Sequence, residues 1–177
     1  MDYFATFATD FMKISEEFDT AVAFAREEAM RTGCTQIGAD HLMLGLLRLG
    51  SESVSSFLAE NGIDPAELKA AVEKRVFRPH GIPYGLEDDI RLGEDGNSAI
   101  NLAIAAAQME GASEAGVEHL VRALGGITGS ECSRILREAG LRISAAKHAA
   151  ETKEYTPSED EINRLLGAFS YNSEYPS

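Results

Sequence analysis

The sequence predicts an all-α fold built from two copies of one helical unit, and three observations lead to this prediction. First, the residues Gly38-Ala39-Asp40-His41-Leu42 return as Gly116-Val117-Glu118-His119-Leu120, so that the two histidines lie 78 positions apart. Second, the same offset pairs further residues without a gap, such as Leu46 with Leu124. Third, apolar residues recur at helical spacing along most of the chain, and no segment shows the alternation of a strand.

Four helices are expected in the first copy, over residues 14–76. Ser15 is a candidate N-cap for the first of them, which carries a stripe of small alanines and ends at a glycine. A nearly apolar helix from about Asp40 to Leu49 follows, and it should be the buried centre of its half. Ser51 is a candidate cap for the third helix, and the capping box Asp64-Pro65-Ala66-Glu67 opens the fourth.

The second copy, over residues 94–153, repeats this pattern more weakly. Its helices are expected at about residues 96–110, 118–125, 130–139 and 144–153. Gly125-Gly126 interrupts the counterpart of the buried helix, since Gly125 stands where the first copy has Leu47. We therefore expect the buried helix of the second copy to be shorter than that of the first.

Three further segments complete the chain. Residues 1–13 carry aromatic side chains at helical spacing. They are expected to form a helix docked on the domain's own surface, a partly ordered extension, or a segment that occupies the groove of a partner. Residues 77–93 are rich in proline and glycine and are the predicted linker between the repeats. Residues 154–177 hold an extra helix that follows a capping signature at Thr156-Pro157-Ser158, and then a frayed tail.

Composition and charge exclude several classes of function. A formal net charge of -13 argues against binding to nucleic acid or to an anionic membrane surface. No apolar run is long enough to span a bilayer, and the N-terminus lacks the basic and apolar regions of a signal peptide. Cys34 and Cys132 form no CxxC or other metal spacing, so we expect reduced thiols and a cytoplasmic protein.

The repeated motif resembles a known module. In the first copy an alanine-rich helix runs into Gly33, and a short loop leads to Ile37-Gly38-Ala39-Asp40-His41-Leu42. This arrangement resembles the Clp repeat at the front of the Clp family of AAA+ unfoldases, whose motif is Ile/Val-Gly-Thr-Glu-His-Leu. The resemblance covers roughly residues 14–152. It implies two four-helix repeats related by a pseudo-two-fold axis, and a domain that docks protein substrates and adaptor proteins for delivery to the ATPase ring.

The resemblance also implies where a ligand binds. In ClpC-like members the acidic residue before the motif histidine lies in a site that reads phosphoarginine, and it corresponds to Asp40 and Glu118 here. A threonine near the start of each repeat corresponds to Ser15 in the first copy and to Gly93 in the second. Because an apolar residue also replaces the motif threonine in both copies, we expect a weakened, asymmetric site. Its groove should lie between the repeats, with Asp40 and Glu118 at the rim.

The motif histidines leave a second class of function open. The pairs Asp40-His41 and Glu118-His119 are residues that a small hydrolase or a metal enzyme would use. However, each histidine precedes a leucine-rich buried helix, and a histidine that ties the loop to the helix explains both. The spacings of the common metal-binding and phosphate-binding motifs are also absent. We therefore expect no catalytic residue, no metal and no cofactor.

The docking function itself has two forms. The chain is either the front part of a longer unfoldase or a free-standing Clp-repeat regulator that competes for adaptors. It lacks the lysine and the preceding strand of a Walker A motif, so we expect no ATP hydrolysis of its own. The initial methionine, the aromatic segment and the extra helix favour the free-standing or strongly diverged form. The expected partners are protein or peptide substrates, adaptors and, in the first form, an AAA+ ring.

Overall fold

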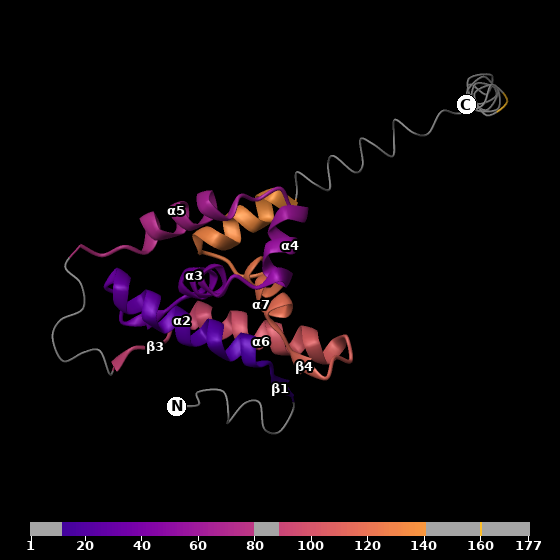
Figure 1. Cartoon of the computed structure of the whole chain (residues 1–177), viewed down its shortest axis with the longest axis horizontal. Helices are drawn as coiled ribbons and strands as arrows, with labels where there is room; N and C mark the ends of the chain where they lie inside the picture. Colours follow the sequence, from indigo (N-terminus) through magenta and orange to yellow (C-terminus); the bar gives the residue numbers. More distant parts are fainter. Residues whose placement is uncertain (1–11, 80–88, 141–159, 161–177) are drawn as a thin grey trace, which may run out of the picture. The chain divides into compact units, whose positions relative to one another are not determined.

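The computed structural model describes residues 12–79, 89–140 and 160, and the chain divides into a unit of residues 1–140 and a second unit of residues 141–177. The described part of the first unit consists of helices joined by short loops, with four strands of two residues each (Figure 1). The all-α class is thereby confirmed. The predicted aromatic segment up to residue 11, the helix over 144–153 and the extra helix after residue 157 lie outside the described residues, Asp160 excepted.

Each repeat contributes helices and short strands in the same order. The first repeat has β1 (Lys13–Ile14), α2 (Glu16–Thr32), β2 (Gln36–Ile37), α3 (Ala39–Leu49), α4 (Glu52–Glu60) and α5 (Pro65–Val76). The second repeat has β3 (Arg91–Leu92), α6 (Glu94–Met109), β4 (Glu114–Ala115), α7 (Val117–Leu124) and a helix over residues 131–140. α7 is shorter than α3, as the interruption at Gly125 predicts.

The predicted helix starts are confirmed where the capping residue acts on its own helix. The hydroxyl oxygen of Ser15 accepts a bond from the amide of Phe18 at 3.1 Å, and a carboxylate oxygen of Asp64 accepts one from the second residue of α5 at 3.1 Å. Ser51 occupies the N-cap position of α4, but its hydroxyl donates to the carboxylate of Glu17 at 3.1 Å instead of accepting from the helix.

The strands cross between the repeats and reveal their symmetry. β1 pairs in parallel with β4, so that Lys13 faces Glu114, and β2 pairs in parallel with β3, so that Gln36 faces Arg91. Residues 13 and 91 are repeat equivalents, and so are residues 36 and 114. The second pairing is therefore the first with the two repeats exchanged, as a pseudo-two-fold axis requires. Strands of two residues are too short to show alternation, which is why the sequence does not reveal them.

α2 and α3 pack with their backbones in direct contact. Every residue of α3 from Ala39 to Leu46 is buried, and the alanines Ala21 and Ala25 of α2 are fully buried beside it. A Cβ atom added to Gly45 would collide with the carbonyl oxygen of Ala21. The stripe of small residues on α2 and the glycine on α3 thus permit the close approach that the alanines predict.

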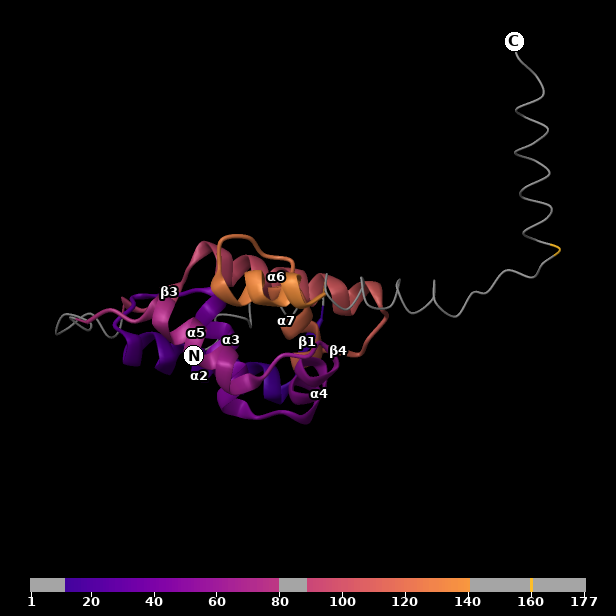
Figure 2. The ribbon, with the colours of Figure 1, turned by 90° about the horizontal axis from the view of Figure 1, so that it is seen from above.

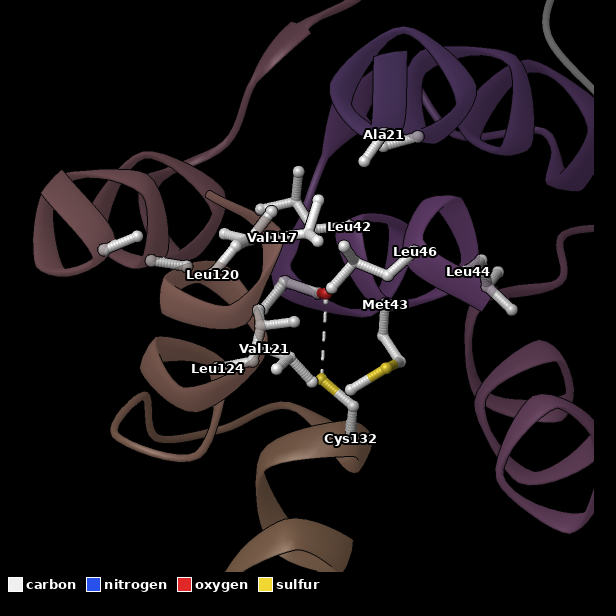
Figure 3. Packing of buried hydrophobic residues seen from close by; sticks show 14 of the residues in the cluster. Ala21, Leu42, Met43, Leu44, Leu46, Val117, Leu120, Val121, Leu124 and Cys132 are labelled. Atoms are coloured by element: carbon white, nitrogen blue, oxygen red, sulfur yellow. Dashed lines mark hydrogen bonds between the residues drawn. The ribbon is translucent and has the colours of Figure 1, made fainter. Parts of the chain in front are cut away.

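α3 meets α7 at the centre of the domain. Leu42 and Leu46 of α3 lie next to side chains of α7, including Val121, in the packing that Figure 3 shows. Met43 and Cys132 point toward one another, which joins α3 to the helix of residues 131–140. In Figure 2, α2 and α4 lie on one side of α3 and α7, and α6 lies on the other.

Part of the predicted linker belongs to the folded domain. Ile90 is fully buried in the core, and Arg91–Leu92 forms β3. None of the helices in the described ranges is long and apolar enough to cross a membrane.

Candidate docking site

The two motif histidines bind the glycine that precedes each central helix. Nδ1 of His41 accepts a hydrogen bond from the amide of Gly38 at 2.9 Å, and Nδ1 of His119 accepts one from the amide of Gly116 at 2.9 Å. Each glycine is the N-cap of its helix and each histidine is the third helical residue. The ring therefore takes the place of the glutamate in a capping box. The predicted tie between loop and helix is confirmed in both repeats.

The opposite ring nitrogens have partners that also repeat. Because Nδ1 accepts, Nε2 carries the proton of the neutral ring. Nε2 lies 3.3 Å from the hydroxyl of Thr32 in His41 and 2.9 Å from the carboxylate of Glu110 in His119. Thr32 and Glu110 are repeat equivalents, so the offset of 78 positions could have identified both. Both nitrogens of each ring are engaged within the protein, which is the pattern of a structural histidine.

The burial of His41 makes the stability of the fold depend on pH. Burial lowers the pKa of His41 below its usual value, against the opposing charges of Asp40 and Asp95. The unfolded chain then binds more protons than the folded chain just below the unfolded pKa of about 6.5. We expect the free energy of unfolding to fall as the pH drops from about 7 to about 5. The fall should be smaller in His41→Asn, whose amide oxygen can still accept from Gly38. Urea unfolding at several pH values checks this, and equal slopes in both proteins would contradict it.

Asp40 is buried, and its carboxylate caps a helix of the other repeat. One oxygen accepts from the amide of Cys132 at 2.8 Å, and the other accepts from the amide of Glu131 at 3.2 Å. These amides belong to the first two residues of the helix over 131–140, so the negative charge also offsets the positive end of that helix dipole. Asp40 is 6% exposed. We expected Asp40 at the rim of a groove. The structure places its carboxylate in the contact between the repeats, where Asp40 also lines a hollow together with Arg75 and Arg78.

Asp95 makes the reverse connection, from the second repeat to the first. One carboxylate oxygen accepts from the amide of Ala39, the first residue of α3, at 3.2 Å. The other accepts from the amide of Gly96 at 2.9 Å. Gly38 has no side chain to cap α3, and Asp95 supplies the missing acceptor. Sequence analysis did not identify this role, because a pairing across 56 positions leaves no local pattern.

Glu118, the counterpart of Asp40, is exposed. Its side chain is 51% exposed, and one carboxylate oxygen lies 3.6 Å from Nδ1 of His119. The carboxylate also folds back over Gly116, where an added Cβ atom would collide with it. Equivalent positions of the two repeats therefore have different roles, since Asp40 holds the domain together and Glu118 faces solvent.

The strand pairing brings Ser15 to the motif that contains Glu118. The amide of Ser15 donates to the carbonyl oxygen of Ala115 at 2.9 Å, one residue before the motif begins. In the exchanged position, Gly93 lies beside the motif of the first repeat, and it supplies no side-chain cap to α6. Of the three predicted site residues, Ser15 and Glu118 thus lie along one strand pair, and Asp40 lies beside the other.

Cys132 is a further titratable residue that is buried in the core. Burial raises the pKa of the Cys132 thiol, and its closest charged neighbour is Asp40, so this sulfur stays protonated at neutral pH. Within residues 12–79 and 89–140, no group of three histidine, cysteine, aspartate or glutamate side chains is placed to hold a metal ion.

The doubled helical unit, the crossed strands and the two histidine ties define a double Clp repeat. The chain belongs to the Clp repeat (R) N-terminal domain family, which it matches over residues 13–139. It is 27% identical over 139 residues to the chaperone protein ClpB of Oceanobacillus iheyensis. It is 28% identical over 139 residues to ClpC/MecB of Bacillus subtilis, a negative regulator of genetic competence. Each alignment covers 77% of this chain and 16% of the relative, so the chain spans about a sixth of their length.

Solved structures show the same fold. The N-terminal domain of Hsp104 from Candida albicans matches with a TM-score of 0.60 and 15% identity, over 72% of this chain and 82% of that one. The N-terminal domain of the chaperone ClpD from Arabidopsis thaliana matches with a TM-score of 0.54 and 20% identity, over 81% of this chain and 98% of that one.

Proposed function

We propose that this chain is a non-catalytic, cytoplasmic docking domain that presents protein substrates or adaptor proteins to a Clp unfoldase. Its membership of the Clp repeat family supports this proposal. The two histidines that would serve an enzyme both accept a bond from the N-cap glycine of their helix, whereas Glu118 is exposed and available for recognition. The unfoldase ring and its protease are part of the proposal, because the chain matches only the front of such proteins.

We further propose a weakened phosphoarginine-type site at Glu118, with Ser15 beside it. The observation that carries this proposal is the half-exposed carboxylate of Glu118 at the start of α7, whereas the carboxylate of Asp40 already accepts two amide bonds. An exposed carboxylate can take the fork of a guanidinium group through paired charge-assisted bonds.

The charges near the site add a reason for the weakening. Arg122, one turn after Glu118, is already paired with Glu110 at 3.0 Å. The first turn of α2, which Ser15 caps, carries Glu16, Glu17 and Asp19. These carboxylates would repel a phosphoryl group and attract an unmodified guanidinium. We therefore expect a peptide with free arginine to bind at least as tightly as the same peptide with phosphoarginine.

Fluorescence anisotropy with these two peptides tests the site. We expect Glu118→Gln to weaken binding of the arginine peptide by about two- to fivefold, the range of a partly exposed ion pair. Glu67→Gln is the matched control, because it removes the same charge from an exposed position in the first turn of α5 and should leave binding unchanged. Equal binding by wild type and Glu118→Gln would remove Glu118 from the site. Failure of both peptides to bind would contradict the recognition of arginine altogether.

A further inference from the structure

The outer face of the first repeat is covered by an arginine of the same repeat. The guanidinium carbon of Arg48, at the end of α3, lies 4.4 Å from the centre of the Phe24 ring on α2. One of its nitrogens lies 2.6 Å from a carboxylate oxygen of Glu27. A cation with a hydrocarbon stem thus lies across an apolar side chain and ends at an acid.

The second repeat has lost this cover. At the equivalent positions Leu102 replaces Phe24, Gly126 replaces Arg48 and Ala105 replaces Glu27. Leu102 is left 44% exposed, although it faces the loop that follows α7. A hollow of about 810 Å³ lies there, between α6 and that loop. Its lining includes Glu94, Asp95, Ser98, Leu102, Ile127 and Thr128.

We propose that this hollow binds an extended segment of a partner polypeptide that carries an apolar residue and, three or four positions away, an arginine or lysine. The apolar residue would lie on the exposed Leu102, beside the largely buried Ile127, and the basic residue would reach Glu94. Eight helical residues separate Leu102 from Glu94, which corresponds to about 12 Å along α6. An extended chain covers that distance in about three or four residues.

The charge of the hollow selects a basic partner. Glu94 and Asp95 line it and no lysine or arginine does, and the whole chain has a formal net charge of -13. The carboxylate of Asp95 already accepts two amide bonds, so Glu94, which is exposed, is the group left to pair with a cation. Ser98, Asn101 and Thr128 supply hydroxyl and amide groups for the backbone of the bound segment. The apolar residue of the partner would thus cover Leu102 as the side chain of Arg48 covers Phe24 in the first repeat.

No residue that lines the hollow belongs to the Glu118 motif, and the inference rests on the proposed function only in that the ligand is a polypeptide. Its probe is a labelled, end-capped ten-residue peptide of glycine and serine with one leucine and one arginine three positions apart. Gly126→Arg introduces the residue that stands at the equivalent position of the first repeat, Arg48, and its side chain would fill the hollow. A Cβ atom there meets the carbonyl oxygen of Ala123 at 3.3 Å, a tight contact that requires a small shift, and Leu102 at 3.7 Å.

We expect Gly126→Arg to weaken binding of this peptide about tenfold, because the leucine loses its apolar contact. Glu94→Gln should weaken it by about two- to fivefold, and a peptide with glutamate in place of arginine should bind still less. Leu102→Gln alters the opposite wall at an exposed position, and it provides a second variant if Gly126→Arg is poorly folded. Ala59→Arg, on the exposed face of α4, is the charge-matched control and should bind as the wild type does.

Three results would overturn the inference. The first is that Gly126→Arg and Leu102→Gln both bind the peptide with the same affinity as Ala59→Arg. Another is equal affinity for the arginine and glutamate peptides. The third is a change in self-association caused by Gly126→Arg, measured by sedimentation, which would make a second copy of this chain the occupant. Loss of binding in Glu118→Gln but not in Gly126→Arg would uphold the docking function and refute this site.

Discussion

We expect the replacement of Asp40 by alanine to lower the free energy of unfolding more than the removal of any other polar side chain. The carboxylate accepts from the amides of Glu131 and Cys132, and both amides would be left without a partner at a buried helix start. Loss of a cap together with unsatisfied buried amides costs about 2–4 kcal/mol. In a domain of this size that lowers Tm by about 10 °C. Thermal unfolding followed by circular dichroism measures the effect.

The internal repeat provides the control for this experiment. Glu118→Ala makes the corresponding change at the equivalent position, where the side chain is 51% exposed. We expect that variant to lie within about 0.5 kcal/mol of the wild type. Asp40→Asn keeps one acceptor oxygen and should fall between the two. Equal stabilities of Asp40→Ala and Glu118→Ala would show that the bonds from Asp40 to the amides of Glu131 and Cys132 do not stabilise the domain.

Gly45→Ala is expected to be at least as damaging, although alanine favours a helix over glycine by about 1 kcal/mol. The added Cβ atom would collide with the carbonyl oxygen of Ala21 and approach the backbone nitrogen of Ala25 to 2.9 Å. These are backbone atoms of a packed helix, so α2 and α3 would have to move apart. Overpacking of this kind costs about 3 kcal/mol or more and outweighs the gain in propensity. Urea unfolding would reveal the loss as a lower midpoint.

Two comparisons isolate the steric cause. Alanine stands at the counterpart of Gly45 in the second repeat, Ala123, so the residue type itself suits this place in the fold. Gly126→Ala adds a Cβ atom whose nearest neighbour lies at 3.3 Å, and it should change stability by less than about 0.5 kcal/mol. A Gly45→Ala variant as stable as the wild type would contradict the close approach of α2 and α3.

What the sequence predicts well is what neighbouring residues decide. The capping bonds of Ser15 and Asp64 reach only a few positions along the chain, and the patterns that predict them are equally local. Both histidine ties are also local, and their repetition made them easier to interpret. Within the described residues, helix starts and ends therefore agree with the prediction to within about two residues.

What the sequence could not predict are contacts between residues far apart along the chain. The bond from Asp40 to Cys132 spans 92 positions, and the bond from Asp95 to Ala39 spans 56. The hydroxyl of Ser51 was free to cap its own helix, but the fold brings Glu17 within reach across 34 positions. The motif thus identified Asp40 and Glu118 as a related pair, whereas only the packing of the two repeats distinguishes their roles.

The pairing of strands between the repeats affects how the domain unfolds. Each strand has its only backbone partner, among the described residues, in the other repeat, and the carboxylates of Asp40 and Asp95 cross in opposite directions beside them. If either repeat unfolds locally, the other repeat loses its strand pairing and the cap of one helix at the same time. Partial unfolding of one half is therefore costly, and the two repeats should melt together in a single cooperative transition.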